Sequence, residues 1–233
     1  MTKGLFPMIL MMASLLATTA FGGQGAARPS DQAEFLIVEG LTVDAQGNTV
    51  IPAKADPDTK LYYRRSGKPV LAPDGRTVTA ATFAAAAGTA EATCVPSGTR
   101  VELHLSGLIP DAMYRLWLIL FKEPGFDLGP PPDMSNAIGE GALGERGRSG
   151  NSFKASPAGE AIITLVQPPG PMSEKLPPGF ANEPAGACLV TDAFEWHVVG
   201  AFQQPDQPSG PDVGPPLFFP ETAVEQFVFI FKK

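Results

Sequence analysis

The sequence predicts an all-β protein built as a sandwich of two sheets, and three observations support this. Apolar residues recur at every second position in several runs of strand length, which is the period of a sheet with one buried face. The 233 residues include 25 Gly and 25 Pro, which favour turns and loops between short strands. One stretch alone, residues 80–87, has the composition and flanking signals of a helix.

Composition also limits the classes of function. Hydrophobic residues make up 44% of the chain, which is enough to build a core, and charged residues make up 18%. The 17 Lys and Arg against 24 Asp and Glu give a net charge of -7. A nucleic-acid-binding protein needs a basic face for phosphates, so this balance argues against nucleic acid as a partner. It does not favour an anionic membrane surface either.

The N-terminus has the pattern of a cleaved secretory signal. Lys3 precedes an almost wholly apolar run over residues 5–16, and small residues follow at 17–20. We expect residues 1–20 to be removed, with a second acceptable cleavage site as late as residue 27. The apolar run is short for a membrane span, so no integral span is expected after cleavage; an uncleaved anchor is the alternative. The mature protein is then expected to be periplasmic or extracellular.

Two regions follow the signal: a β-rich lead-in over residues 28–74 and the sandwich domain over residues 75–233. The single helix is expected to begin after an N-cap at Thr79 and to end at Gly88. Turn residues separate the expected strands, which are 34–39, 41–43, 89–95, 99–105, 114–121, 152–155, 160–166, 187–190, 194–202 and 224–231. Long Gly/Pro loops are expected at 123–148, 167–186 and 203–220, and loops of this length often carry function.

Side-chain patterns assign faces to three of these strands. Residues 99–105 alternate cleanly, so one face is buried and the other polar. Residues 114–121 are apolar on both faces, which is typical of a central strand. At the C-terminus, Phe227 and Phe229 share a face with Phe231, opposite Gln226.

The chain contains two cysteines, Cys94 and Cys188. In an exported protein an even number of cysteines favours a disulfide, and two cysteines allow one connectivity. Two buried free thiols are the alternative. Neither cysteine lies in a CxxC motif or beside basic residues, so a reactive thiol is not expected.

One motif is specific to a fold. Leu108, Pro110 and Tyr114 have the spacing L-x-P-x-x-x-Y and precede an apolar strand. This resembles the tyrosine corner of Greek-key sandwiches such as fibronectin type III and immunoglobulin domains, in which the Tyr hydroxyl bonds to the backbone between sheets. The resemblance implies an immunoglobulin-like Greek-key sandwich. Leu116 stands where antibody domains have a cysteine, so their inter-sheet disulfide is not implied.

More broadly, residues 75–233 resemble a group of exported bacterial proteins of unknown function. The resemblance rests on the stretches GTRVELHLSGLIPDAMYRLW, NSFKASPAGEA, FEWHVVGAF and EQFVFIFK. It implies export and the sandwich fold, and it carries no known chemistry.

The two histidines of the chain occur in the same local pattern. Glu102 and His104 are two residues apart on one expected strand, and Glu195 and His197 are two apart on another. Residues two apart on a strand point to the same face. If the two strands were neighbours in register, the four side chains could bind a transition metal ion. The alternative is that each pair is a solvated or hydrogen-bonded polar pair on its own strand.

The leading interpretation is an exported protein without catalytic activity, with a structural or binding role and no cofactor. The sequence has no G-x-S-x-G nucleophile motif and no zinc-binding cysteine spacing. The alternative is a metal-binding protein or metalloenzyme that uses the two Glu-x-His strands and a transition metal ion. The sequence does not identify the partner; an envelope protein and a glycan are the candidates.

Overall fold

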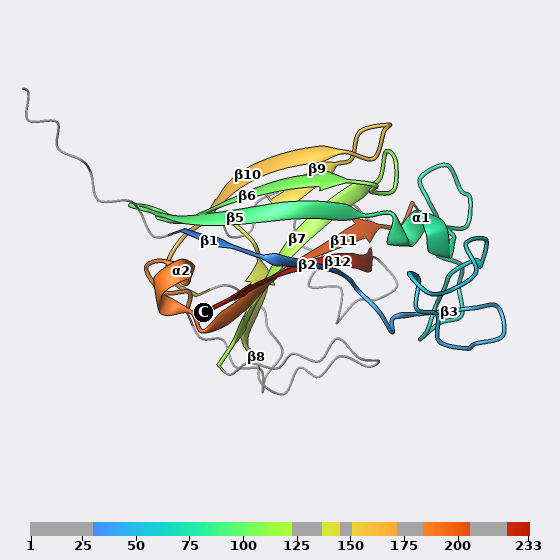
Figure 1. Cartoon of the computed structure of the whole chain (residues 1–233), viewed down its shortest axis with the longest axis horizontal. Coiled ribbons are helices and arrows are strands. Elements are labelled where there is room, and N and C mark those ends of the chain that lie inside the picture. The colour runs from blue at the N-terminus through green and yellow to red at the C-terminus, as the bar shows by residue number, and fades with distance from the viewer. Residues whose placement is uncertain (1–29, 123–136, 145–150, 172–183, 206–222) are drawn as a thin grey trace, which may run out of the picture.

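The computed structural model describes residues 30–122, 137–144, 151–171, 184–205 and 223–233 (Figure 1). The described chain is mostly β-structure in antiparallel sheets with few helices, which confirms the predicted all-β class. The expected signal peptide lies outside the described residues, as do most of the three long loops. Within the described parts, no helix is long and apolar enough to cross a membrane.

Two large sheets are formed. Sheet A contains four strands in the order β1-β5-β6-β10, with bounds Ser30–Gln32, Ala87–Val95, Gly98–Ser106 and Ala161–Gln167. Sheet B has the order β2-β12-β11-β7-β8, with bounds Glu34–Ile37, Ala223–Lys232, Glu195–Gln203, Met113–Phe121 and Ala137–Ala142. Strand β9 (Ser152–Lys154) also pairs with β7, and β3 (Thr42–Val43) pairs with β4 (Tyr62–Tyr63) in a small separate sheet.

The lead-in contributes to both large sheets. β1 pairs with β5 in sheet A, and β2, one residue later, pairs with β12 in sheet B. Between them, the Ala33 N–H donates to the Ala90 carbonyl at 3.2 Å. The chain therefore passes from one sheet to the other at Ala33 and joins them along one side.

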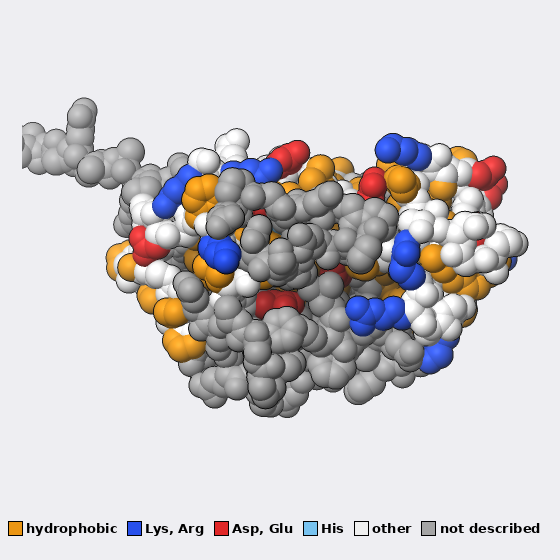
Figure 2. Space-filling model, turned by 90° about the horizontal axis from the view of Figure 1, so that it is seen from below, with side chains coloured by type: hydrophobic (Ala, Val, Ile, Leu, Met, Phe, Trp, Pro, Cys, Tyr) orange, Lys and Arg blue, Asp and Glu red, His pale blue; other side chains and the backbone are white. Residues whose placement is uncertain are grey.

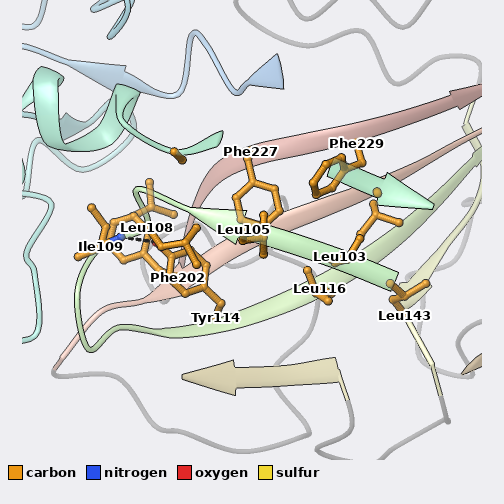
Figure 3. Packing of buried hydrophobic residues seen from close by; sticks show 14 of the residues in the cluster. Leu103, Leu105, Leu108, Ile109, Tyr114, Leu116, Leu143, Phe202, Phe227 and Phe229 are labelled. Atoms are coloured by element: carbon orange, nitrogen blue, oxygen red, sulfur yellow. Dashed lines mark hydrogen bonds between the residues drawn. The ribbon is translucent and has the colours of Figure 1, made fainter. Parts of the chain in front are cut away.

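The two sheets face each other across one hydrophobic core (Figure 3). Sheet A contributes Leu103 and Leu105, and sheet B contributes Leu116, Phe227 and Phe229, all of them buried. Burying such a side chain completely contributes about 1.5–3 kcal/mol, so this layer is the main source of stability. The alternation predicted for residues 99–105 is confirmed, because Leu103 and Leu105 point into this core.

Both helices are short. α1 (Ala80–Ala84) begins after Thr79, whose Oγ1 accepts from the Thr82 N–H at 3.3 Å, as the expected N-cap. It ends before the predicted Gly88, because Gly88 already belongs to β5. The backbones of β5 and β6 approach closely here: a Cβ at Gly88 would lie 2.7 Å from the His104 carbonyl oxygen. A larger residue would therefore require the strands to shift.

Two element predictions are wrong. The strand expected at 187–190 is replaced by α2 (Leu189–Asp192), where the Asp192 carboxylate accepts from the Cys188 N–H at 3.1 Å. A carboxylate that satisfies a free backbone N–H at this end favours a helical turn over a strand. In addition, β8 lies inside the expected loop 123–148. This strand, AIGEGA, contains two glycines, and glycine has a low preference for strands, so the sequence pattern did not predict it.

Gln226 also departs from the prediction. The register of β12 against β11 shifts, so that Gly200 pairs with Phe227 and Ala201 with Glu225, and Gln226 is left unpaired in a bulge. Gln226 is fully buried, and its Nε2 donates to the Phe83 carbonyl at 2.9 Å. Its side chain therefore reaches the core instead of the face opposite Phe227.

Candidate functional site

The two Glu-x-His motifs lie in different sheets. On β6 of sheet A, the side chains of Glu102 and His104 are 38% and 52% exposed, and Oε1 lies 3.1 Å from Nε2. On β11 of sheet B, Glu195 and His197 are buried, and the same two atoms lie 2.6 Å apart. Each pair therefore meets on its own strand, as expected. β6 and β11 are not neighbours, so the structure does not bring the four side chains together.

No other metal site takes their place in the described chain. Among residues 30–122, 137–144, 151–171, 184–205 and 223–233, no group of three or more His, Cys, Asp and Glu side chains is arranged to hold a metal ion. The buried pair on β11 is instead packed as part of sheet B. The His197 ring lies against Phe121 with centroids 4.4 Å apart. Burial, followed by the positive charge of Lys232, lowers the pKa of His197 to about 3, so the imidazole is neutral at physiological pH.

The predicted disulfide is present. Cys94 and Cys188 are bonded with their Cα atoms 5.5 Å apart, and 94 residues separate them in sequence. The bond joins β5 of sheet A to the residue that precedes α2, and it leaves no free cysteine among the described residues.

Tyr114 makes the contact expected of a tyrosine corner. The Ile109 N–H donates to the Tyr114 hydroxyl at 2.8 Å, where the chain crosses from β6 in sheet A to β7 in sheet B (Figure 3). The hydroxyl in turn donates to the Gln226 side-chain oxygen. Leu108 is buried beside this contact, while Pro110 lies exposed in the turn. These contacts hold the crossover between the two sheets.

Sheet B is buried on both faces, and its second face carries charged residues. Along β7, Leu116 and Leu118 enter the core shared with sheet A, while Arg115, Trp117 and Ile119 point the other way. We call this second side the outer face of sheet B. It holds a separate hydrophobic cluster made of Val38, Trp117, Ile119, Phe121, Val199, Val228 and Ile230.

Strand register places two glutamates on the outer face. Glu140 on β8 is opposite Ile119 of β7. Glu225 on β12 is opposite Ala201 of β11, which is itself opposite Arg115 of β7. The two carboxyls thus lie on the same face of sheet B, where the charge of Glu225 acts on Glu140. Figure 2 shows the molecule from the side of sheet B, and acidic side-chain atoms reach the surface near the middle of that view.

Both glutamates are buried, and within the described chain neither has a positively charged partner. Glu140 is 4% exposed and Glu225 is 7% exposed, and neither carboxyl makes a hydrogen bond or ion pair with any residue in the described chain. Burial, with the charge of Glu225 added, raises the pKa of Glu140 to about 8. Burial raises the pKa of Glu225 to about 7. At neutral pH, Glu140 is mostly protonated and Glu225 about half protonated.

Further polar groups lie on this face. Strand register places Glu195 and His197 of β11 there, opposite Phe121 and Ile119 of β7. Arg115 is buried, and with the Gln203 amide turned to satisfy both groups, its Nη2 and Nε donate to the Gln203 oxygen at 2.8 and 3.1 Å. The Trp117 Nε1–H is buried and has no acceptor among the described residues. Polar groups buried without partners are uncommon in folded proteins, so their presence on one face marks it as a candidate site.

Sequence reasoning did not identify Glu140, Glu225 or Arg115. Glu140 lies in a segment expected to be a loop, and Glu225 lies beside Gln226 near the start of a strand that is mostly apolar. The available signal was a charged residue inside a strand whose neighbours are apolar on both faces, as for Arg115 in 114–121.

No protein-family model matches the chain, and no curated protein matches it either.

Proposed function

We propose that this chain is an exported, non-catalytic protein with a binding role, and that it recognises a positively charged ligand on the outer face of sheet B. The observation that carries the proposal is the pair Glu140 and Glu225, two buried carboxyls without hydrogen-bonding or ionic partners in the described chain. Burying a carboxyl in this way costs stability. Such groups concentrate where proteins bind ligands or carry out chemistry.

A cation is the ligand class that suits this pair. An ammonium or guanidinium group donates hydrogen bonds to carboxylates and favours their ionised form, which lowers their pKa. Arg115, on the same face, donates to the Gln203 side-chain oxygen. Binding of a cation near pH 7 would therefore expel protons from the two carboxyls.

We also propose that the sandwich has the Greek-key, immunoglobulin-like topology and that the protein is exported to the periplasm or beyond. The topology is supported by the crossover that Tyr114 holds and by the passage of β1 and β2 between the sheets. Export is supported by the signal pattern of residues 1–20 and by the disulfide.

The metal-binding alternative has less support. It needs Glu102 and His104 beside Glu195 and His197, and these pairs lie in different sheets. Elemental analysis of the mature protein purified without chelators tests this alternative directly. A stoichiometric transition metal that is lost on His197→Ala would favour it over the cation-binding role.

Calorimetry tests the cation-binding proposal. Spermidine serves as the ammonium probe and arginine methyl ester as the guanidinium probe, each titrated at pH 7 in buffers of different ionisation enthalpy. The wild-type protein is expected to bind at least one probe and to release protons on binding. The double variant Glu140→Gln, Glu225→Gln is expected to bind at least about tenfold more weakly, a loss of about 1.4 kcal/mol, without proton release.

Glu102→Gln is the matched control, because it removes an exposed carboxyl from the other sheet. It is expected to bind the probes like the wild type. Absence of binding by both probes would contradict the proposal, and so would binding that the double variant leaves unchanged.

A further inference from the structure

The open edge of sheet A is the longest unprotected strand edge in the described chain. Strand β10 pairs with β6 on one side, and no described strand pairs with its other side. Its seven residues, AIITLVQ, contain no charge and no proline. Ile162 is 73% exposed, and Thr164 is also exposed.

The other edge strands of the two large sheets are protected. They are six residues or shorter, and each carries a charged residue: Asp31 on β1, Glu34 on β2, Glu140 on β8 and Lys154 on β9. Natural sheets block unwanted pairing in this way, with short edges and charged side chains. β10 lacks both devices, which marks it as an edge suited to pairing.

At the centre of β10, backbone N–H and C=O groups point to the side where no described strand pairs. The Ala90 carbonyl of β5 points away from β6, because it accepts from the Ala33 N–H. Backbone groups of successive strand residues point to alternate sides. Ala90 is opposite Leu103 of β6, so the backbone groups of Leu103 point towards β10, where Leu103 is opposite Ile163. The N–H and C=O of Ile163 therefore point towards β6, and those of its neighbours Ile162 and Thr164 point to the open edge. At the end of the strand, the Gln167 side chain accepts from the Gly144 N–H at 2.8 Å, so the open part centres on Ile163.

We propose that β10 pairs with β10 of a second copy of this chain, in antiparallel orientation about a two-fold axis at Ile163, so that the two four-stranded sheets join into one. This register sets Ile162 opposite Thr164 of the second copy, and it buries the exposed Ile162 in part. We favour a second copy of the chain as the partner, because two identical uncharged edges can pair without repelling each other. The chain has a net charge of -7, which opposes association elsewhere, whereas this edge is uncharged.

Sedimentation equilibrium of the mature protein tests the proposal. The wild type is expected to have the mass of a dimer at high concentration and to dissociate on dilution. The double variant Ile162→Lys, Thr164→Lys sets lysines opposite each other and is expected to weaken the dimer at least about tenfold. Both positions are exposed, so the variant is expected to fold, and circular dichroism checks this.

Two further variants make the test specific. Thr89→Lys adds the same charge to an exposed position of β5, in the same cross-strand row as Ile162, and is expected to leave the dimer unchanged. The variant Ile162→Glu, Thr164→Glu is expected to be monomeric alone and to form a heterodimer when mixed with the lysine variant.

Three results would overturn the proposal. The first is a wild type that stays monomeric. This result would count against the proposal even if the β10 edge bound an unrelated extended peptide. The second is a dimer that the lysine variant leaves intact, and the third is a mixture of the oppositely charged variants that fails to associate.

Discussion

Replacing Glu140 by glutamine tests whether the buried carboxyl destabilises the folded protein. The pKa of Glu140 rises from 4.5 in the unfolded chain to about 8 in the folded one. One pKa unit corresponds to about 1.4 kcal/mol, so this difference lowers the free energy of unfolding by up to about 5 kcal/mol. Glutamine has nearly the same shape and carries no ionisable proton, so the variant escapes this loss.

The effect has a defined dependence on pH. At about pH 4, both the folded and unfolded states are largely protonated at this position, and the variant and wild type are expected to be equally stable. As the pH rises through 4.5 towards 8, the unfolded state ionises first, so the wild type loses stability. Above pH 8 the loss is complete and constant. Glu140→Gln is therefore expected to be the more stable protein at about pH 9.

Urea unfolding at these two pH values measures the difference. The expected gain at high pH lies between about 2 and 5 kcal/mol, with no gain at low pH. Glu102→Gln, at an exposed carboxyl, is expected to change stability by less than about 0.5 kcal/mol at either pH. An equal change at both pH values, or a variant that is less stable at high pH, would refute the reasoning, because it would mean that the folded protein stabilises an ionised Glu140.

Three further changes test the fold. Replacing Cys94 and Cys188 together by serine is expected to lower the free energy of unfolding by about 4–5 kcal/mol, since the disulfide closes a loop across 94 residues; an unchanged urea midpoint would contradict this. Tyr114→Phe leaves the Ile109 N–H and the Gln226 oxygen without their partner and is expected to cost about 2–4 kcal/mol; a cost near zero would show that the corner does not depend on the hydroxyl. Gly200→Ala would place a Cβ 2.0 Å from the buried Phe227 ring and is expected to cost about 3 kcal/mol or more; a wild-type melting temperature would mean that the ring can move aside.

The strands that the sequence predicted correctly share a strong local pattern. Residues 99–105 and 224–231 alternate, and residues 114–121 are apolar on both faces. These segments became β6, β12 and β7 with bounds that differ by one residue at most at each end. The turn signal at Tyr114 and the even number of cysteines could also be read without knowing the fold, and both interactions are present.

The errors occurred where a distant contact overrides local preference. β8 is rich in glycine and forms because β7 offers it a pairing edge. α2 follows Cys188, which is bonded to Cys94 in the other half of the chain. Gln226 turns into the core because a bulge frees it from the alternation and because Tyr114 and Phe83 offer it hydrogen-bonding partners.

The candidate site shows the same division. The sequence alone determined that Glu195 and His197 share a face, since side chains two apart on a strand must do so. It could not determine that their strand and that of Glu102 belong to different sheets, or that Glu140 and Glu225 are buried on one face. Periodicity and turns depend on neighbours in the chain, whereas burial and pKa depend on which strands pair across long sequence separations. Only the tertiary structure decides that pairing, because it is selected by the packing of the whole core.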